Sequence, residues 1–155
     1  MDRIDRKILV LFQANTRLVA TEIGAKVGLS AAAVQRRLKR LREADVIRRE
    51  IAALDPQQVG VPITCIVTLA MVSRAAPREQ LERFKSAMLK LPNVQQCYQV
   101  TGTVDFVLVV TAASMEAYAE FARSWFESNA TVARYDTHVV LDNVKVGLEL
   151  PIQFV

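Results

Sequence analysis

Hydrophobic side chains recur at every third or fourth position through the first third of the chain, which is the spacing of an α-helix. The pattern predicts a first helix over residues 2–14 and, after a break at 15–17, a second apolar stripe from Leu18 to Val27. Gly28 follows that stripe and can adopt the left-handed conformation that ends a helix. The N-terminal segment is therefore predicted to be helical.

A third helix is predicted over residues 31–44, preceded by Ser30, a favourable N-cap residue. Val34, Leu38 and Leu41 lie at i, i+4 and i+7 and form a narrow apolar seam. The other positions of this helix are polar and mostly basic: Gln35, Arg36, Arg37, Lys39, Arg40 and Arg42. Two helices joined by a short turn, the second of them basic, are typical of a helix-turn-helix, whose second helix enters the DNA major groove.

Two short apolar runs follow the third helix, at 46–47 and at Ile51, on either side of Arg48 and Arg49. This arrangement predicts a β-wing with basic residues in it. The stretch 55–62 contains two prolines and a glycine, so we expect it to be a linker between two domains.

From residue 63 onward the hydrophobic period changes to two, as in β-strands. The predicted elements run strand, helix, strand, strand, helix, strand, over 63–72, 77–91, 94–101, 105–111, 114–129 and 131–141, and a last strand is predicted over 144–150. This βαββαβ order is that of a ferredoxin-like fold. The predicted class is therefore α+β: an N-terminal winged helix-turn-helix domain (1–54), a linker (55–62) and a ferredoxin-like domain (63–155).

The first strand of the second domain is apolar on both faces. Strand alternation gives one face to the helices, while Ile66, Ala70 and Val72 make the other face apolar as well. A second copy of the chain is the most economical cover for such a face. We therefore predict a homodimer through the sheets; the alternative is that the alternation only reflects strand propensity.

Basic residues are concentrated near the N-terminus. Residues 1–60 contain 12 Lys and Arg against 7 Asp and Glu, a net charge of +5, whereas residues 61–155 have a net charge of −1. The asymmetry favours a polyanionic partner for the N-terminal segment, although a solvated basic face would give the same count. The chain has neither the run of roughly 18 apolar residues of a membrane span nor an apolar signal region. We expect a cytoplasmic protein with no membrane partner.

Metal, cofactor and enzyme chemistry find little support in the sequence. The two cysteines, Cys65 and Cys97, are far apart, and His138 is the only histidine, whereas a zinc or redox site needs more ligands at closer spacing. We expect free thiols, no metal site and no cofactor. An enzyme built on a small barrel of paired ferredoxin-like domains is the alternative, but the chain has no G-x-G-x-x-G and no nucleophile elbow.

Several motifs together point to one family. They are the opening 2–9 (Asp-Arg-Ile-Asp-Arg-Lys-Ile-Leu), Glu22-Ile23, Val27-Gly28-Leu29-Ser30, Val34, 37–41 (Arg-Leu-Lys-Arg-Leu) and Val46-Ile47. This combination resembles the DNA-binding domain of the Lrp/AsnC family of amino-acid-responsive transcription regulators. Residues 63–150 resemble the effector-binding and oligomerisation domain of that family. The resemblance implies a sequence-specific regulator that binds double-stranded DNA, and dimers that assemble into an octamer.

The predicted DNA contacts combine the basic third helix with the wing. We expect Arg37, Lys39 and Arg40 to be the main contacts, with five further candidates: Ser30, Gln35, Arg36, Arg48 and Arg49. Two positions depart from the family pattern. Val19 stands where the family often has Ser or Asp as N-cap of the second helix, and Asp45 replaces the usual Gly after the third helix. Asp tolerates the left-handed conformation better than most residues.

The family's effector binds between subunits, near the loop that joins the second and third strands of this domain. The matching positions are Val100, Thr101, Gly102, Thr103, Val104 and Asp105, with Tyr135 and Thr137 from the fourth strand. Gly102 would let backbone N–H groups approach a ligand carboxylate, and Asp105 would face an α-ammonium group. The alternative is that Gly102 only makes the turn and Asp105 caps it.

The predicted effector is therefore a small molecule, an amino acid, that modulates the oligomeric state or DNA binding. The loop differs from the Gly-Asp-x-Asp that is common in the family, because Thr103 stands where that pattern has Asp. A ligand-independent architectural DNA-binding protein of the same fold is the alternative function.

Overall fold

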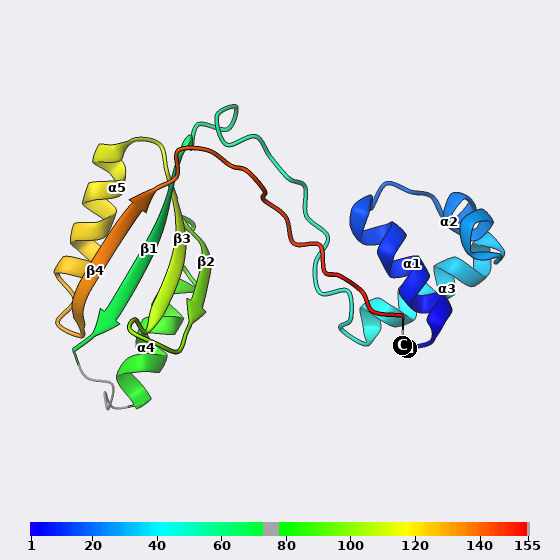
Figure 1. The fold of residues 1–155 in the computed structure, drawn as a ribbon, viewed down its shortest axis with the longest axis horizontal. Coiled ribbons are helices and arrows are strands. Elements are labelled where there is room, and N and C mark those ends of the chain that lie inside the picture. The colour runs from blue at the N-terminus through cyan, green and yellow to red at the C-terminus, as the bar shows by residue number, and fades with distance from the viewer. Residues whose placement is uncertain (73–77, 155) are drawn as a thin grey trace. The chain divides into compact units, whose positions relative to one another are not determined.

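The computed structural model describes residues 1–72 and 78–154, and the chain forms two compact units. The first unit contains Met1–Ala53 together with Lys145–Val155, and the second contains Leu54–Val144. Figure 1 shows the helices of the first unit and the sheet of the second. Pro77, which was expected to open a helix, lies outside the described residues.

Three helices make up most of the first unit, within the limits predicted from periodicity: α1 (Arg3–Ala14), α2 (Ala20–Val27) and α3 (Ala31–Glu43). Asp2 caps α1 by accepting a hydrogen bond from the Asp5 backbone N–H, and Asp5 accepts one from the Asp2 N–H in return. Gly28 ends α2 at a φ of 75°, in the left-handed region. Ser30 caps α3, its hydroxyl accepting from the Ala33 N–H at 3.2 Å.

Side chains from all three helices form the core of this unit. Ile8, Phe12, Ile23, Val34 and Leu38 pack together, and none of them is more than 6% exposed. Leu41 is buried as well, so the seam predicted for α3 is confirmed. This seam fixes which face of α3 points outward.

The predicted β-wing is not formed as strands: within the described structure, residues 46–53 contain none. The backbone N–H groups of Val46 and Ile47 both donate to the carbonyl of Leu41 and close the end of α3. These groups are therefore not available for a strand ladder. Asp45 stands at the turn with a φ of 56°, which confirms that it occupies a left-handed position.

The second unit has the predicted βαββαβ order. Its elements are β1 (Ile63–Met71), α4 (Arg78–Met88), β2 (Val94–Gln99), β3 (Phe106–Ala112), α5 (Met115–Ala122), the π-helical turn η1 (Arg123–Glu127) and β4 (Val132–Val139). The strands form an antiparallel sheet in the order β2-β3-β1-β4, as a ferredoxin-like fold requires. The predicted fold class is confirmed.

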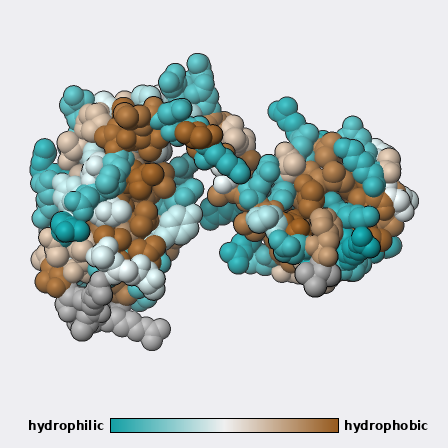
Figure 2. Space-filling model, viewed as in Figure 1, coloured by the Kyte–Doolittle hydropathy of each residue, from teal (hydrophilic) through white to brown (hydrophobic). Residues whose placement is uncertain are grey.

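The helices cover one face of this sheet. Cys65, Val67 and Leu69 of β1 are fully buried against helix side chains, which are Phe84, Met88, Tyr118, Phe121 and Phe126. The opposite face carries Ile66 and Tyr98, which are 39% and 51% exposed. Hydrophobic side chains reach the surface of this unit in patches (Figure 2). This face is thus apolar only in part: Ile66 is exposed on β1 as the alternation predicted, but the residues of β4 on the same face, Arg134, Asp136 and His138, are polar.

The end of the helical segment formed by α5 and η1 differs from that of the helix predicted over 114–129. The helical spacing of Tyr118, Phe121, Ala122 and Trp125 predicts that Trp125 faces the core. Trp125 packs against the core but is only half-buried, whereas the neighbouring Phe126 is 1% exposed. The π-helical turn η1 holds one more residue than an α-helical turn and so shifts the buried position by one.

The strand predicted over 144–150 is not formed; the described residues contain four strands, and β4 is the last of them. Residues 145–155 cluster with the first unit, whereas the sequence pattern assigned them to the second domain. The physical reason is a pair of hydrogen bonds between Gln13 and the backbone of Leu150. In the described part of the chain, no helix is both long and apolar enough to cross a membrane.

Candidate functional site

One face of α3 is open to solvent along most of its length. Ala32, Gln35, Arg36 and Lys39 are all exposed and lie at i, i+3, i+4 and i+7, on the side opposite the buried seam. We call these four residues the exposed face of α3. The helix N-terminus, capped by Ser30, borders this face. The structure thus presents a polar, basic helical surface of the kind that fits a DNA groove.

Arg37 lies off the exposed face and is bound to the start of α1. Its guanidinium lies 2.6 Å from the carboxylate of Asp2 and 2.8 Å from that of Asp5, and its side chain is only 22% exposed. Arg40 donates to the other oxygen of Asp5 at 2.7 Å, although its side chain is still 60% exposed. The Asp5 side chain is fully buried. We call these four residues the Asp–Arg cluster.

The pKa shifts of Asp2, Asp5 and Arg37 all favour the charged forms of these side chains. The hydrogen bond from Arg37 lowers the pKa of Asp2 from 3.8 to about 2. Burial works to raise the pKa of Asp5, but the hydrogen bonds from the Asp2 N–H and from Arg37 outweigh it, so that the pKa is lowered. The same contacts raise the pKa of Arg37. At neutral pH two carboxylates therefore balance two cations of α3.

The basic residues after α3 lie around a shallow hollow. It has a volume of about 330 Å³ and is lined by Arg42, Ile47, Arg48, Arg49 and Glu50. Arg42 forms an ion pair with Glu50 at 2.7 Å, whereas Arg48 and Arg49 are exposed. The predicted DNA contacts of this segment are thus at the surface, although no wing strands carry them.

The sequence did not reveal the Asp–Arg cluster. It ranked Arg37 and Arg40 among the main DNA contacts, and the structure binds both to acidic groups of α1. The only available signal was the pair of aspartates at positions 2 and 5 of a segment that is otherwise basic. Their partners lie more than 30 residues away, so periodicity alone could not pair them.

In the second unit, the loop between β2 and β3 is held by its own backbone. The N–H of Val100 donates to the carbonyl of Asp105 at 2.9 Å, and the N–H of Asp105 donates to Leu69 at 2.7 Å. Gly102 has a φ of 117°, which favours glycine. One carboxylate oxygen of Asp105 accepts from the N–H of Met71 at 2.7 Å. Asp105 therefore ties the loop to the end of β1.

Tyr135 and Thr137 lie on the face of β4 that the helices cover. The hydroxyls of Thr137 and Tyr118 are 2.5 Å apart, and burial raises the pKa of Tyr118. The hydroxyl of Tyr135 donates to Glu127 at 2.6 Å, a bond that raises the pKa of Tyr135 to about 12. Both residues are thus hydrogen-bonded within their own chain rather than to the loop 100–105.

Comparison with known proteins matches both units. Residues 64–150 match the Lrp/AsnC ligand binding domain, and residues 1–42 match the AsnC-type helix-turn-helix domain. The chain belongs to the Lrp/AsnC family. As a member of that family it is a DNA-binding transcriptional regulator with a ligand-binding domain.

Relatives of this Lrp/AsnC regulator are similar over almost its full length. An HTH-type transcriptional regulator of Sinorhizobium fredii, y4tD, is 42% identical over 99% of this chain and 89% of its own. The crystal structure of an AsnC family regulator from Agrobacterium tumefaciens is 32% identical, with a TM-score of 0.88 over 97% of both chains. A regulator of Neisseria meningitidis, solved in complex with L-Met, is 29% identical, with a TM-score of 0.88 over 97% of this chain and 96% of that one.

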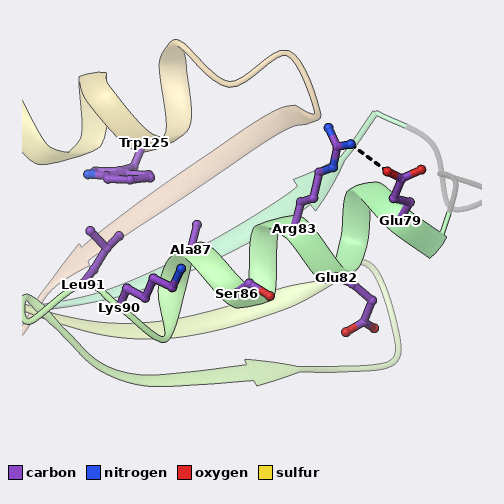
Figure 3. A pocket seen from close by; sticks show the side chains of 8 residues that line it. All are labelled: Glu79, Glu82, Arg83, Ser86, Ala87, Lys90, Leu91 and Trp125. Atoms are coloured by element: carbon purple, nitrogen blue, oxygen red, sulfur yellow. Dashed lines mark hydrogen bonds and ion pairs between the residues drawn. The ribbon is translucent and has the colours of Figure 1, made fainter.

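Another hollow of this Lrp/AsnC chain lies between α4 and η1 of the ligand-binding domain. It has a volume of about 620 Å³ and contains none of the predicted site residues (Figure 3). Trp125 and Leu91 form its apolar part, while Arg83 and Glu79 pair with each other at 2.6 Å on its rim. Its charged groups are exposed and face solvent, so the hollow lacks the buried polar groups of a specific ligand site.

Metal ligands are not assembled in the described part of this Lrp/AsnC chain: no three His, Cys, Asp or Glu residues are placed to hold an ion. Both cysteines are free, and burial raises the pKa of each thiol. The thiols are therefore predominantly protonated at neutral pH.

Proposed function

We propose that the exposed face of α3 enters the DNA major groove and makes the sequence-specific contacts of this regulator. The single observation that supports this proposal is that the polar and basic side chains of α3 point in different directions. Gln35, Arg36 and Lys39 point outward, whereas Arg37 is bound to Asp2 and Asp5. Arg and Gln on an exposed helical face can form bidentate hydrogen bonds to guanine and adenine edges.

The remaining cations then take different roles. Arg40 has a side chain that is 60% exposed and can reach a phosphate at the edge of the groove while it stays close to Asp5. Arg48, Arg49 and the N-terminus of α3 at Ser30 would contact phosphates on either side. Arg37 would orient α3 rather than bind DNA.

Salt dependence of binding tests this division of roles. Each phosphate contact adds roughly −0.9 to the slope of log K against log salt. With mixed-sequence duplex DNA, Lys39→Ala and Arg40→Ala should each weaken binding and flatten the slope by up to that amount. Arg83→Ala, on the exposed surface of α4, is the matched control and should change neither. An unaltered slope in both α3 variants would contradict the proposed interface.

We further propose that the second unit binds an amino acid. The support is the match to a ligand binding domain and a structural relative that was solved with L-Met. The candidate residues are those of the loop and of β4: Val100, Thr101, Gly102, Thr103, Val104, Asp105, Tyr135 and Thr137. The second oxygen of Asp105 would face the ligand ammonium group, since Met71 occupies the first.

A specific observation also favours the alternative, a ligand-independent architectural DNA-binding protein. The polar groups expected to hold an effector, in Asp105, Tyr135 and Thr137, already bond within the chain. Calorimetry against the twenty amino acids separates the two functions. Heat of binding from at least one of them supports the effector, and no heat from any of them supports the architectural protein.

The proposed assembly starts from a homodimer through the open sheet face. Ile66 and Tyr98 leave apolar surface on that face, which a second copy would cover. The family resemblance implies that these dimers assemble into an octamer that binds double-stranded DNA. We expect this octamer in the cytoplasm. Light scattering on the purified protein, with and without each amino acid, measures both the oligomeric state and its response. A monomer under all conditions would contradict the assembly.

A further inference from the structure

The C-terminal tail, which we define as residues 145–154, is bound to α1 of the DNA-binding unit. The side-chain amide of Gln13 donates to the carbonyl of Leu150 at 2.8 Å and accepts from the N–H of the same residue at 3.1 Å. The guanidinium of Arg6 donates to the carbonyl of Gln153. One side chain of α1 thus satisfies both backbone groups of a tail residue.

The tail lies along a face of α1 that the domain core does not use. Arg6, Leu9, Val10 and Gln13 are spaced at i, i+3, i+4 and i+7, so they share one face of the helix, and all four are half-buried. The core is formed by a different stripe, which includes Ile8 and Phe12. We call these four residues the docking face of α1.

The tail is held through its backbone rather than through apolar burial. The side chains of Leu148 and Leu150 are 69% and 70% exposed. Pro151 follows directly and restricts Leu150 to extended conformations, which leaves its N–H and C=O in position for the Gln13 amide. The pair of bonds copies the pattern by which one strand residue pairs with another.

Chain connectivity gives this contact a functional meaning. The tail follows β4, which carries the candidate effector residues Tyr135 and Thr137, after the non-strand residues 140–144. The linker that precedes β1 is the first connection between the units, and the bound tail is a second. A ligand that changes β4 therefore has two routes to the DNA-binding unit, the linker and the tail bound to α1.

We propose that the docking face of α1 is the binding site for the C-terminal tail and that this contact couples the effector domain to DNA binding. The coupling rests on the proposed effector function, whereas the docking does not. A ligand can shift DNA binding through the tail only if it binds the docked and undocked states with different affinity.

Hydrogen exchange tests the docking without any ligand. In Gln13→Ala, the backbone amide of Leu150 within the C-terminal peptide 145–155 should exchange faster than in the wild-type protein, because its N–H loses the side-chain oxygen of Gln13 as acceptor. Gln80→Ala, an exposed glutamine on α4, is the matched control and should leave this peptide unaltered. Equal exchange in Gln13→Ala and wild type would overturn the docking.

DNA binding with and without amino acid tests the coupling. The ratio of the two Kd values, measured first with L-methionine and then with the other nineteen amino acids, should fall towards one in Gln13→Ala. A chain truncated after Gly147 keeps α1 intact and should show the same loss, even if Gln13→Ala disturbs the helix. A wild-type ratio in the truncated chain would overturn the coupling. If no amino acid changes the Kd of the wild-type protein, the coupling fails; calorimetry then decides separately whether an amino acid binds, and the exchange result decides the docking.

Discussion

The carboxylate of Asp5 lies 2.8 Å from the guanidinium of Arg37, across the interface between α1 and α3. The Asp5 side chain has no exposed surface, so its charge depends on this partner and on Arg40. The contact joins the opening of the chain to the DNA-binding helix. It explains why two acidic residues stand at the start of a segment whose partner is a polyanion.

Replacing Asp5 with Asn should lower the stability of the folded chain. Asn keeps the size of the side chain but gives up the charge-assisted hydrogen bonds to Arg37 and Arg40, each worth about 1.5–3 kcal/mol where desolvated. Because Arg40 is mostly exposed, we expect a total loss near the lower end of that range. Urea unfolding measures it, with the exposed Asp142→Asn as control. A stability equal to wild type would contradict the structural role of the Asp–Arg cluster.

The acid sensitivity of the first unit should depend on Asp2. Its pKa is lowered from 3.8 in the free residue to about 2 in the folded chain, mainly by Arg37. A lowered pKa means that this contribution to stability is complete above pH 3.8 and is lost as the pH falls towards about 2. Unfolding measured across this range should be less steeply pH-dependent in Asp2→Asn than in wild type. Parallel curves for the two proteins would rule out the pairing with Arg37.

Local patterns were sufficient for most of the fold. The helical spacing around Ile8, Val34 and Leu38 predicted three helices and their buried seam, because the buried residues of an amphipathic helix recur every three to four positions. The order of strands and helices after residue 63 predicted the ferredoxin-like topology for the same reason. Asp45 was predicted to adopt a left-handed conformation, and it does.

Contacts between distant segments could not be read in the same way. The Asp–Arg cluster removes Arg37 from the exposed face of α3, and Gln13 binds Leu150 from the other end of the chain. The alternation of valine and leucine after residue 143 predicted a strand, but a local pattern does not show whether the backbone pairs with another strand or, as at Leu150, with the side chain of Gln13. The π-helical turn likewise moved the buried position from Trp125 to Phe126.

Gly24 should not tolerate even the smallest side chain. A Cβ at this position would lie 2.4 Å from the backbone oxygen of Leu29, in the turn between α2 and α3. Alanine favours helix by about 1 kcal/mol over glycine, but overpacking costs about 1–3 kcal/mol, so Gly24→Ala should be destabilising. Thermal unfolding measures the change. Gly147→Ala, with open space around its Cβ, is the control and should be near neutral.

Val19→Ser should stabilise the chain. Val19 is the N-cap of α2 and has no side-chain acceptor, although Glu22 already accepts from its backbone N–H at 3.1 Å. Serine would add a hydroxyl acceptor for the Glu22 N–H, but that N–H already donates to the Val19 carbonyl at 3.0 Å, so we expect a contribution below about 1 kcal/mol. Val19→Ala removes the same apolar side chain without adding an acceptor, so it is the control. Equal unfolding free energies for the serine and alanine variants would show that the cap is not formed.

Asp45→Gly should stabilise the chain through the backbone alone. Asp45 adopts a φ of 56° at the end of α3, where the N–H of Val46 bonds to the carbonyl of Leu41 at 2.9 Å. The left-handed conformation costs most residues roughly 1–2 kcal/mol and glycine almost nothing. Because Asp tolerates it better than most, the expected gain is below about 1 kcal/mol, while Asp45→Val should lose stability. Urea unfolding measures the change in unfolding free energy for both variants. If Asp45→Gly is less stable than wild type, the side chain of Asp45 stabilises the fold by more than its left-handed backbone conformation costs.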